Sequence, residues 1–332
     1  MEKFRTLFMG TPEFAVPTLK FLAAHHAVVG VVTQPDKPRG RGQKLLPSAV
    51  KEAASRLKIP VYQPPKVKAA EFLDVLRGLK PELIVVVAFG QILPPEILSL
   101  PPYGCINVHA SLLPDYRGAA PMQWCLIEGE TKTGVTTMYM DEGLDTGDML
   151  VKKEISLPPD MTFGELHDEL KELGVAALKE TLEKLAASTL RRTAQPAESS
   201  YAPLITKETG HIDWQKSAGA IHNLVRGLNP APGAYTYLGE AKYKIWRAEV
   251  LNEKGAGQPG EIVTADGQNG LKVATGDGLL RIKEWQAPGG KKMTVPDYLR
   301  GHAITLPASF GCVSKTKRRS GCGEETCRKE ET

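Results

Sequence analysis

The stretch Leu83-Ile84-Val85-Val86-Val87-Ala88-Phe89 is the longest apolar run in this chain of 332 residues. A membrane-spanning helix needs roughly 18 apolar residues, so the run is too short to cross a bilayer. Four of its first five residues are β-branched, which favours an extended backbone. The run therefore predicts a buried strand.

Strand-like and helical patterns alternate on both sides of this run. Apolar, β-branched runs lie at 5–9, 27–33, 83–88 and 105–109, and helical patterns begin near residue 13 and cover about 48–57. This alternation is typical of βαβ units. We therefore predict an α/β fold with a doubly wound, mostly parallel, Rossmann-like sheet. Two further strands at 135–140 and 149–155, and a long helix over 163–187, complete the predicted domain.

The sequence after residue 186 loses its apolar period and becomes rich in Ser, Thr, Ala and Pro, as linkers do. We predict a first domain over 1–189, a linker over 190–206 and a small OB-like β-barrel domain over 207–311. A short helix at 217–228 and strands at 234–238, 242–251, 260–265, 271–275 and 279–285 support the barrel. Residues 312–332 are predicted to be a disordered tail.

The charge is unevenly distributed along the chain. Apolar residues make up 42% of it and charged residues 24%, which excludes a disordered or fibrous protein. Residues 1–189 carry 21 Lys and Arg against 23 Asp and Glu, whereas residues 190–332 carry 21 against 15. A basic second half indicates a polyanionic partner such as nucleic acid.

Cysteine usage and the first residues indicate the compartment. The five cysteines are an odd number without a framework spacing, so structural disulfides are not expected. The chain begins in a strand pattern without the apolar region of a signal peptide. We therefore expect a cytoplasmic protein with no membrane partner.

Several common motifs are missing. No Gly-x-Gly-x-x-Gly follows a strand pattern, and the Walker phosphate loop, His-Glu-x-x-His and paired Cys-x-x-Cys are absent. Cys322 and Cys327 have no second pair at zinc-ligand spacing. The sequence gives little support for a dinucleotide or ATP site, and we expect no metal.

Asn107-Val108-His109 ends an apolar strand pattern. Side chains two residues apart on a strand face the same side, so the Asn107 amide and the His109 imidazole share one face. Ligands of open α/β sheets bind beyond the carboxyl ends of strands, where this pair lies. Cys105 shares the face, but about 13 Å of strand separates it from His109. Cys105 is therefore interpreted as a buried thiol rather than a nucleophile.

Residues 141–148 form an acidic loop with four carboxylates and two glycines between two predicted strands. One of these carboxylates could reach His109. Acidic loop residues are also common as solvated or turn-forming groups, and a metal cluster is a further alternative. The loop itself does not indicate which carboxylate acts.

Several segments resemble, in their order along the chain, the methionyl-tRNA formyltransferases of the 10-formyltetrahydrofolate-dependent formyltransferase family. The stretch Asn107-Val108-His109-Ala110-Ser111-Leu112-Leu113-Pro114 resembles the family's Asn-x-His and the Ser-Leu-Leu-Pro segment of its folate site. Gly143-Leu144-Asp145-Thr146-Gly147-Asp148 resembles the loop that bears its Asp. Further matches lie at 10–15, 33–42, 117–121, 212–214 and 273–278. The resemblance covers residues 3–310 and not the cysteine-containing end.

The resemblance implies a reaction. The formyl group of 10-formyltetrahydrofolate, a co-substrate, would be transferred to the α-amino group of methionine on initiator methionyl-tRNA. Asn107, His109 and Asp145 would be catalytic, with Asn107 donating to the oxyanion. Either His109 or Asp145 would handle the proton.

The resemblance also implies binding residues. The folate site would consist of Ser111, Leu112, Leu113 and Pro114 together with Phe89, Gly90, Gln91, Ile92 and Leu93. Phe14 would belong to the methionine pocket. We expect the protein to be a monomer.

Two basic regions are expected to bind tRNA. Residues 35–44 carry four cations among glycines and prolines, a pattern too irregular for a helix or strand, and predict a mobile loop. By resemblance this loop contacts the tRNA acceptor end through Arg39, Arg41 and Lys44, with Arg41 central. In the barrel, Lys242 and Lys244 share a strand face opposite Tyr243 and Ile245, and this face could follow phosphates.

Two other functions remain open. A formyltransferase acting on a small amine, such as an amino sugar or a purine-precursor ribotide, would share Asn107, His109 and Asp145. A catalytically silent RNA-binding protein would share the barrel. The basic segment and the barrel favour tRNA, and the three intact side chains favour an enzyme.

Overall fold

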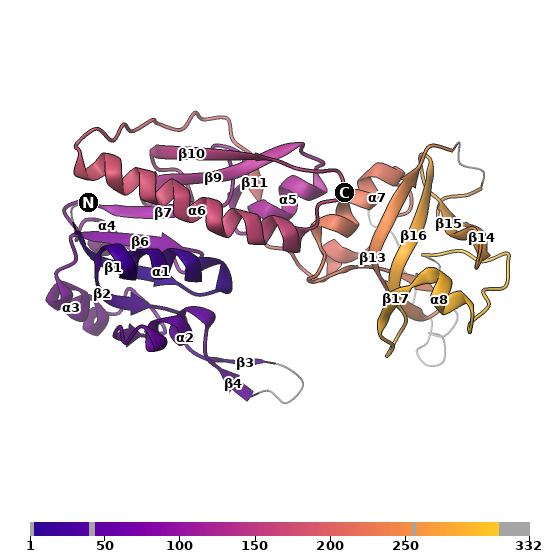
Figure 1. The fold of residues 1–332 in the computed structure, drawn as a ribbon, viewed down its shortest axis with the longest axis horizontal. Coiled ribbons are helices and arrows are strands. Elements are labelled where there is room, and N and C mark those ends of the chain that lie inside the picture. Colours follow the sequence, from indigo (N-terminus) through magenta and orange to yellow (C-terminus); the bar gives the residue numbers. More distant parts are fainter. Residues whose placement is uncertain (1–2, 40–43, 254–256, 312–332) are drawn as a thin grey trace, which may run out of the picture. The chain divides into compact units, whose positions relative to one another are not determined.

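The apolar run at 83–87 forms β6, the middle strand of a seven-stranded sheet (Figure 1). A computed structural model describes residues 3–39, 44–253 and 257–311. Every side chain of β6 is buried, which explains why the run has no polar alternation. The strands of the sheet are β1 (Arg5–Gly10), β2 (Ala27–Val32), β5 (Val61–Tyr62), β6 (Leu83–Val87), β7 (Cys105–His109), β9 (Lys132–Tyr139) and β10 (Met149–Ser156).

The strand order is β10-β9-β7-β6-β1-β2-β5. The pairs β1–β2, β1–β6, β2–β5 and β6–β7 are parallel, whereas β7–β9 and β9–β10 are antiparallel. The predicted mostly parallel sheet is confirmed. After β1 the chain builds β2 and β5 on one side, then returns to build β6 and β7 on the other. This reversal creates a crevice at the carboxyl ends of β1 and β6.

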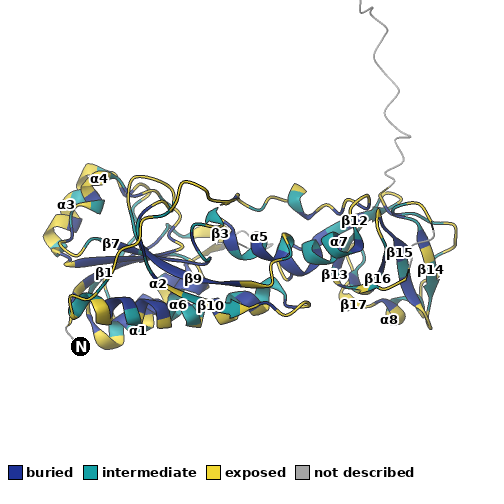
Figure 2. Cartoon of the chain, turned by 90° about the horizontal axis from the view of Figure 1, so that it is seen from above, coloured by how far each residue is buried: buried dark blue, intermediate teal, exposed yellow. Residues whose placement is uncertain are grey.

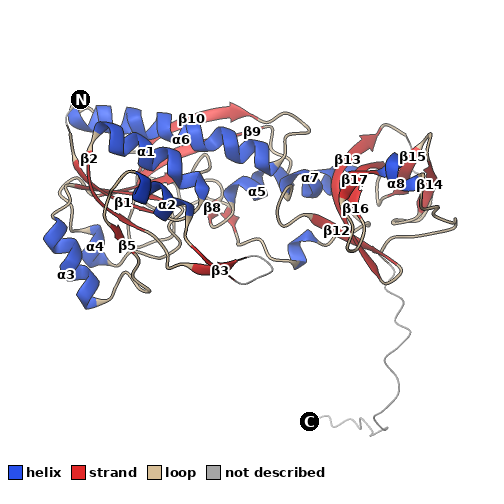
Figure 3. Cartoon of the chain, turned by 60° about the horizontal axis from the view of Figure 1, so that its bottom comes forward, coloured by secondary structure: helices blue, strands red, loops and turns tan. Residues whose placement is uncertain are grey.

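Helices cover both faces of the sheet (Figure 3). One apolar core joins α1 (Val16–His25), α2 (Ala49–Arg56), α5 (Pro121–Ile127) and α6 (Phe163–Ala186), and a second joins α3 (Ala70–Leu79) and α4 (Pro95–Leu98). A short 3-10 turn, η1 (Glu13–Ala15), precedes α1. In Figure 2 the central strands are dark blue, and α3 has an exposed yellow surface. Within the described ranges, no helix has the length and apolar character to cross a bilayer.

The chain divides into two compact units. Residues 1–210 and 223–232 belong to one, and residues 211–222 with those from 233 onward belong to the other. The second contains an antiparallel sheet of order β12-β13-β16-β15-β14, with β17 paired to β16. Its strands are β12 (Ala234–Leu238), β13 (Ala241–Leu251), β14 (Ile262–Asp266), β15 (Gly270–Ala274), β16 (Leu279–Gln286) and β17 (Lys292–Thr294).

Residues 308–311 connect the two edges of this antiparallel sheet. Leu238 of β12 bridges to Phe310, and Glu261 beside β14 bridges to Ser309. This arrangement closes the strand order into the barrel-like form predicted for the second domain. The other elements are η2 (Glu208–Gly210), α7 (Ala218–Gly227) and α8 (Val295–Leu299).

The basic segment at 35–44 differs from its prediction. β3 (Lys37–Arg39) pairs antiparallel with β4 (Lys44–Leu46). The prediction that this segment contains no strand was therefore wrong. Backbone pairing across a short hairpin does not require the apolar alternation for which the sequence was searched. Arg41 and residues 312–332, the predicted tail, lie outside the described residues.

The start of α6 carries a capping box that generates a stability prediction. Thr162 Oγ1 accepts from the Glu165 backbone N at 3.3 Å, and Glu165 Oε2 accepts from the Thr162 backbone N at 2.8 Å. Thr162→Ala should lower the free energy of unfolding by about 1 kcal/mol. Urea unfolding followed by circular dichroism measures this change. Glu169→Ala, on the exposed side of the same helix, is the control; equal stability of the two variants would contradict the capping role.

Candidate active site

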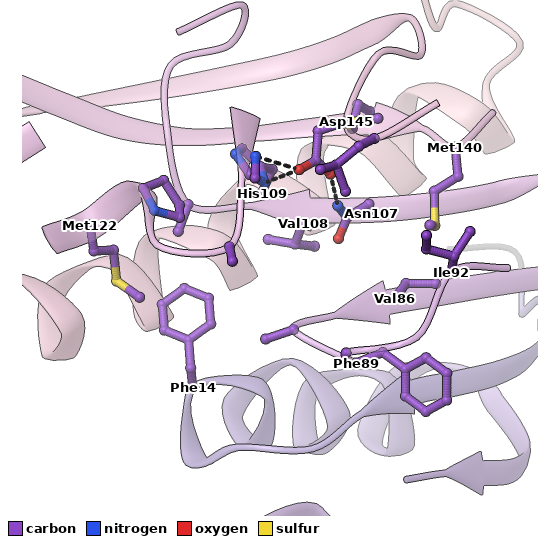
Figure 4. A pocket seen from close by; sticks show the side chains of 18 of the residues that line it. Phe14, Val86, Phe89, Ile92, Asn107, Val108, His109, Met122, Met140 and Asp145 are labelled. Atoms are coloured by element: carbon purple, nitrogen blue, oxygen red, sulfur yellow. Dashed lines mark hydrogen bonds and ion pairs between the residues drawn. The ribbon is translucent and has the colours of Figure 1, made fainter. Parts of the chain in front are cut away.

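A cavity of about 670 Å³ lies outside the carboxyl ends of β1, β6 and β7. Its walls are mostly apolar, and a small polar cluster lies between them. Figure 4 shows Asn107, His109 and Asp145 together, with Phe14 and Met122 on one side of them and Val86, Phe89, Ile92 and Met140 on the other. A deep apolar pocket with a few converging polar groups is the usual form of a small-ligand site.

The three predicted catalytic side chains converge in this cavity. Asn107 Nδ2 donates to Asp145 Oδ1 at 3.3 Å, and His109 Nδ1 lies 3.7 Å from Asp145 Oδ2. The side chains of His109 and Asp145 are only 7% and 12% exposed. Val108 packs into the core on the opposite face of β7, as the strand alternation predicted.

The backbone of Tyr116 determines how the His109 ring is oriented. His109 Nε2 lies 2.9 Å from the Tyr116 carbonyl oxygen, which can only accept a hydrogen bond. The Nε2 atom must therefore carry a proton, and Nδ1 is the ring nitrogen that faces Asp145. Tyr116 itself has a φ of 60°. Its hydroxyl donates to Glu130 Oε1 at 2.7 Å, and burial raises the pKa of that hydroxyl above its ordinary range.

The structure distinguishes among the four carboxylates of the acidic loop. Asp145 Oδ2 accepts from the Gly118 backbone N at 2.9 Å, in addition to its contacts with Asn107 and His109. Asp141 instead accepts from Gly143 N and Thr146 Oγ1 within its own turn. Asp145 adopts a φ of 55°, a left-handed conformation that is uncommon for a residue other than glycine.

The segment Phe89–Leu93 lines one end of the cavity, where the sequence placed part of the folate site. The Phe89 carbonyl oxygen accepts from Thr11 Oγ1 at 3.0 Å and from Gln34 Nε2 at 3.2 Å. These bonds connect the segment after β6 to the residues after β1 and β2. Ile92 is 78% exposed at the rim of the cavity.

Phe14, predicted for the methionine pocket, lines the opposite end and is buried. Its ring centroid lies 5.4 Å from that of His167. Met122 and Phe163 line the cavity with it. This end therefore offers aromatic, thioether and imidazole surfaces around one apolar space.

Residues 111–114, predicted to line the folate site, are not among the residues that line this cavity. Ser111 is buried, and its hydroxyl donates to the Asp115 carbonyl oxygen at 2.6 Å. Leu113 is buried against Met138 and Met149, and its backbone N donates to Thr136 Oγ1. The loop folds back onto β9, so these residues support the turn between His109 and Tyr116.

None of the predicted tRNA-binding residues that the structure describes is among those that line the cavity. Arg39 and Lys44 belong to β3 and β4, and Arg41 lies outside the described residues. In β13, Ile245 is buried whereas Lys242 is exposed. The Nζ atoms of Lys242 and Lys244 lie 3.3 Å and 5.3 Å from the ring centroids of Tyr235 and Trp246, respectively.

The predicted linker contributes cavity residues that sequence reasoning missed. Tyr201 and Leu204 line the cavity and are 60% and 71% exposed. β11 (Tyr201–Ala202) pairs in parallel with β8 (Arg117–Gly118), whose Gly118 backbone N donates to Asp145. The only signal in the sequence was the short apolar stretch Tyr201-Ala202-Pro203-Leu204 within an otherwise polar segment.

Among the described residues, one group of His and carboxylate side chains is close enough to hold a metal ion: Glu13, His167 and Asp168. Lys171 Nζ lies 3.1 Å from Glu13 Oε1 and 2.8 Å from Asp168 Oδ1. The Lys171 ammonium therefore pairs with both carboxylates, and we interpret the group as an exposed ion-pair network.

Both units of the chain match models of known protein families. The formyl transferase family model matches residues 3–182, and the formyl transferase C-terminal domain model matches residues 204–303. A methionyl-tRNA formyltransferase of Trichlorobacter lovleyi is 54% identical over 308 residues, which is 92% of this chain and 96% of the relative. One of Clostridioides difficile is 53% identical over 309 residues, covering 92% of this chain and all of the relative.

Solved structures share the fold at low sequence identity. An N-formyltransferase of Helicobacter canadensis, solved with folinic acid and dTDP-3-aminofucose, has a TM-score of 0.62 at 19% identity and covers 84% of this chain and 98% of its own. HypX of Aquifex aeolicus, solved with tetrahydrofolic acid, has a TM-score of 0.58 at 19% identity over 90% of this chain. This chain spans about half the length of HypX, at 47%.

The two buried cysteines generate a reactivity prediction. Burial raises the pKa of Cys105 to about 12 and that of Cys125 to about 11, so both thiols stay protonated and unreactive at pH 8. Iodoacetamide at pH 8 should leave both unmodified in the folded protein, as measured by peptide mass spectrometry. The same reaction in denaturant should modify both. Rapid labelling of folded Cys105 would restore it as a candidate nucleophile.

Proposed function

The chain belongs to the formyltransferase family, and from this premise we propose that it transfers the formyl group of 10-formyltetrahydrofolate to the α-amino group of methionine on initiator methionyl-tRNA. The observation that carries the proposal is the convergence of an amide, an imidazole and a carboxylate in one cavity at the carboxyl edge of the sheet. The substrate is supported by the 54% identity to a methionyl-tRNA formyltransferase over 92% of the chain.

In the proposed reaction the methionine amine attacks the formyl carbon. A new C–N bond forms, the carbonyl oxygen becomes an oxyanion, and the bond to N10 of the folate then breaks. One N–H of the Asn107 amide donates to Asp145, and the second N–H can donate to the oxyanion. This interaction strengthens as charge develops, which is the condition for lowering the barrier.

The amine must lose a proton, and N10 must gain one. Because Nε2 of His109 donates to Tyr116, Nδ1 is the nitrogen available to take the amine proton. The Asp145 carboxylate lies 3.7 Å from Nδ1 and would stabilise the imidazolium that forms. His109 can then return the proton to N10 as the folate leaves. Asp145 holds Asn107 and His109 in place throughout.

The two ends of the cavity suit the two substrates. The segment Phe89–Leu93 offers an apolar wall with exposed backbone groups, which fits a flat pterin ring. Phe14 and Met122 offer a soft apolar surface, which fits the methionine side chain. The catalytic cluster lies between the two ends (Figure 4), where the formyl carbon and the amine would meet.

The proposal also assigns the roles of the two domains, the oligomeric state and the location of the protein. Residues 1–189 carry the three catalytic side chains, and the barrel over 207–311 binds tRNA together with Arg39, Arg41 and Lys44. Lys242 and Lys244 on β13 are the barrel cations assigned to phosphates. We infer a monomeric active form, in which the three catalytic side chains come from one chain. The enzyme acts in the cytoplasm, where its tRNA substrate is charged and used.

A formylation assay tests the substrate. With 10-formyltetrahydrofolate as the donor, we expect transfer to initiator methionyl-tRNA and none to free amines or to a dTDP-amino sugar. Faster transfer to an amino sugar would establish the small-amine alternative. RNA binding without any transfer would establish a silent binding protein. Elongator methionyl-tRNA, compared in the same assay, measures selectivity for the initiator.

Removal of the catalytic groups should affect turnover rather than binding. Asn107→Ala should lower kcat by about 100- to 1,000-fold because an oxyanion donor is lost, and KM should change little. His109→Ala and Asp145→Ala should also lower kcat strongly. Glu142→Ala, an exposed carboxylate of the same loop, is the control. Near-normal turnover in all three variants would refute the assignment.

The basic segment generates a prediction about salt dependence. If Arg41 neutralises a phosphate, Arg41→Ala should weaken tRNA binding and reduce the slope of log K against log salt by about one. The KM for folate should be unchanged. Lys179→Ala, at an exposed position on α6, removes the same charge elsewhere and serves as the control. An unaltered slope would exclude Arg41 from phosphate binding.

A further inference from the structure

Gln195 lies in the segment that the sequence identified as a linker. It is half-buried, whereas every other residue of 191–200 is exposed. Its Nε2 atom donates to the Asp145 carbonyl oxygen at 2.9 Å and to the Gly147 carbonyl oxygen at 2.8 Å. Both hydrogens of one side-chain amide are therefore used to hold the backbone of the loop that carries Asp145.

The loop needs such a restraint. Asp145 has a φ of 55°, a conformation that L-residues adopt rarely and that persists only when the surroundings enforce it. On one side, Gly147 leaves no room for a side chain, since an added Cβ would lie 2.0 Å from the Tyr139 carbonyl oxygen. On the other side Gln195 binds the carbonyl oxygens. The close packing at Gly147 and the Gln195 hydrogen bonds thus both restrain the loop.

Gln195 also binds the side chain of Arg117, whose two neighbours in sequence contact the catalytic cluster. Gln195 Oε1 accepts from Arg117 Nε at 2.9 Å. Arg117 lies between Tyr116, whose carbonyl oxygen accepts from His109, and Gly118, whose backbone N donates to the Asp145 carboxylate. Ser200, five residues further along the segment, accepts from the Tyr116 backbone N at 2.8 Å through its hydroxyl. One amide group therefore links the Asp145 loop, through the Arg117 side chain, to the segment whose backbone contacts His109 and Asp145.

We propose that Gln195 is a positioning residue for formyl transfer: its amide holds the backbone of the Asp145 loop and binds the Arg117 side chain, so that the carboxylate meets both Asn107 and His109. This inference rests on the proposed function. A displacement of about 1 Å in a reacting group can cost up to about 100-fold in rate. Loss of the amide should therefore lower the rate of the chemical step and leave substrate binding nearly intact.

The alternative is a purely structural role, in which Gln195 only attaches the segment 191–200 to the domain through its hydrogen bond with Arg117. Gln195→Glu separates the two roles. The carboxylate would accept from Arg117 more strongly as an ion pair, but it cannot donate to the carbonyl oxygens of Asp145 and Gly147. A fastening role predicts that this variant keeps its activity. A positioning role predicts that it is at least as impaired as Gln195→Ala.

The experiment measures single-turnover formylation of initiator methionyl-tRNA by the full-length chain at saturating 10-formyltetrahydrofolate. We expect Gln195→Ala and Gln195→Glu to lower the single-turnover rate constant about 10- to 100-fold, with steady-state KM values within about two-fold of wild type. Glu198→Ala, an exposed residue of the same segment, should behave as wild type. Urea unfolding of each variant checks that the fold is retained.

A double-mutant cycle identifies the group through which Gln195 acts. In the Asp145→Ala background, the further change Gln195→Ala should have almost no effect, because the carboxylate that it positions is gone. Additive losses would overturn the proposal, as would normal turnover of Gln195→Ala or retained activity of Gln195→Glu. A wild-type chain without formyl transfer would overturn the proposed function and this inference with it, whereas the other outcomes concern Gln195 alone.

Discussion

The Asp145 carboxylate lies where three separate parts of the chain meet. It accepts hydrogen bonds from Asn107 on β7 and from the backbone of Gly118 on β8, and it lies beside His109 Nδ1. The sheet supplies the rigid part, because β7 fixes the amide and the imidazole two residues apart. The loop after β9 supplies the carboxylate. The cluster therefore depends on strand pairing and loop conformation together, and neither is sufficient alone.

Much of this arrangement follows from local pattern. The apolar run at 83–87 predicted a buried strand, and the alternation over 105–109 predicted that Asn107 and His109 face one way. These rules work because a strand has a two-residue period that no distant contact changes. The carboxyl edge of the sheet also follows from chain order, since the reversal at β1 and β6 creates a crevice in any such fold.

The rest depends on contacts between residues far apart in the chain. Which loop carboxylate faces His109 is decided by the turn that Asp141 caps and by the φ of Asp145. Residues 111–114 matched a motif, but their turn folds onto β9 and not onto the cavity. Gln195 bonds to carbonyl oxygens 48 and 50 residues away. Backbone carbonyls are present in every residue, so no sequence pattern marks them as partners.

The left-handed backbone at Asp145 has a consequence for the evolution of this chain. A residue other than glycine in that region costs about 1–2 kcal/mol. Glycine there would relieve this backbone cost, but it would also remove the acceptor of the Asn107 and Gly118 hydrogen bonds. Under the proposed function, the strained conformation is retained because the carboxylate is used at this position. A substitution that relaxes the backbone without keeping the carboxylate would be selected against.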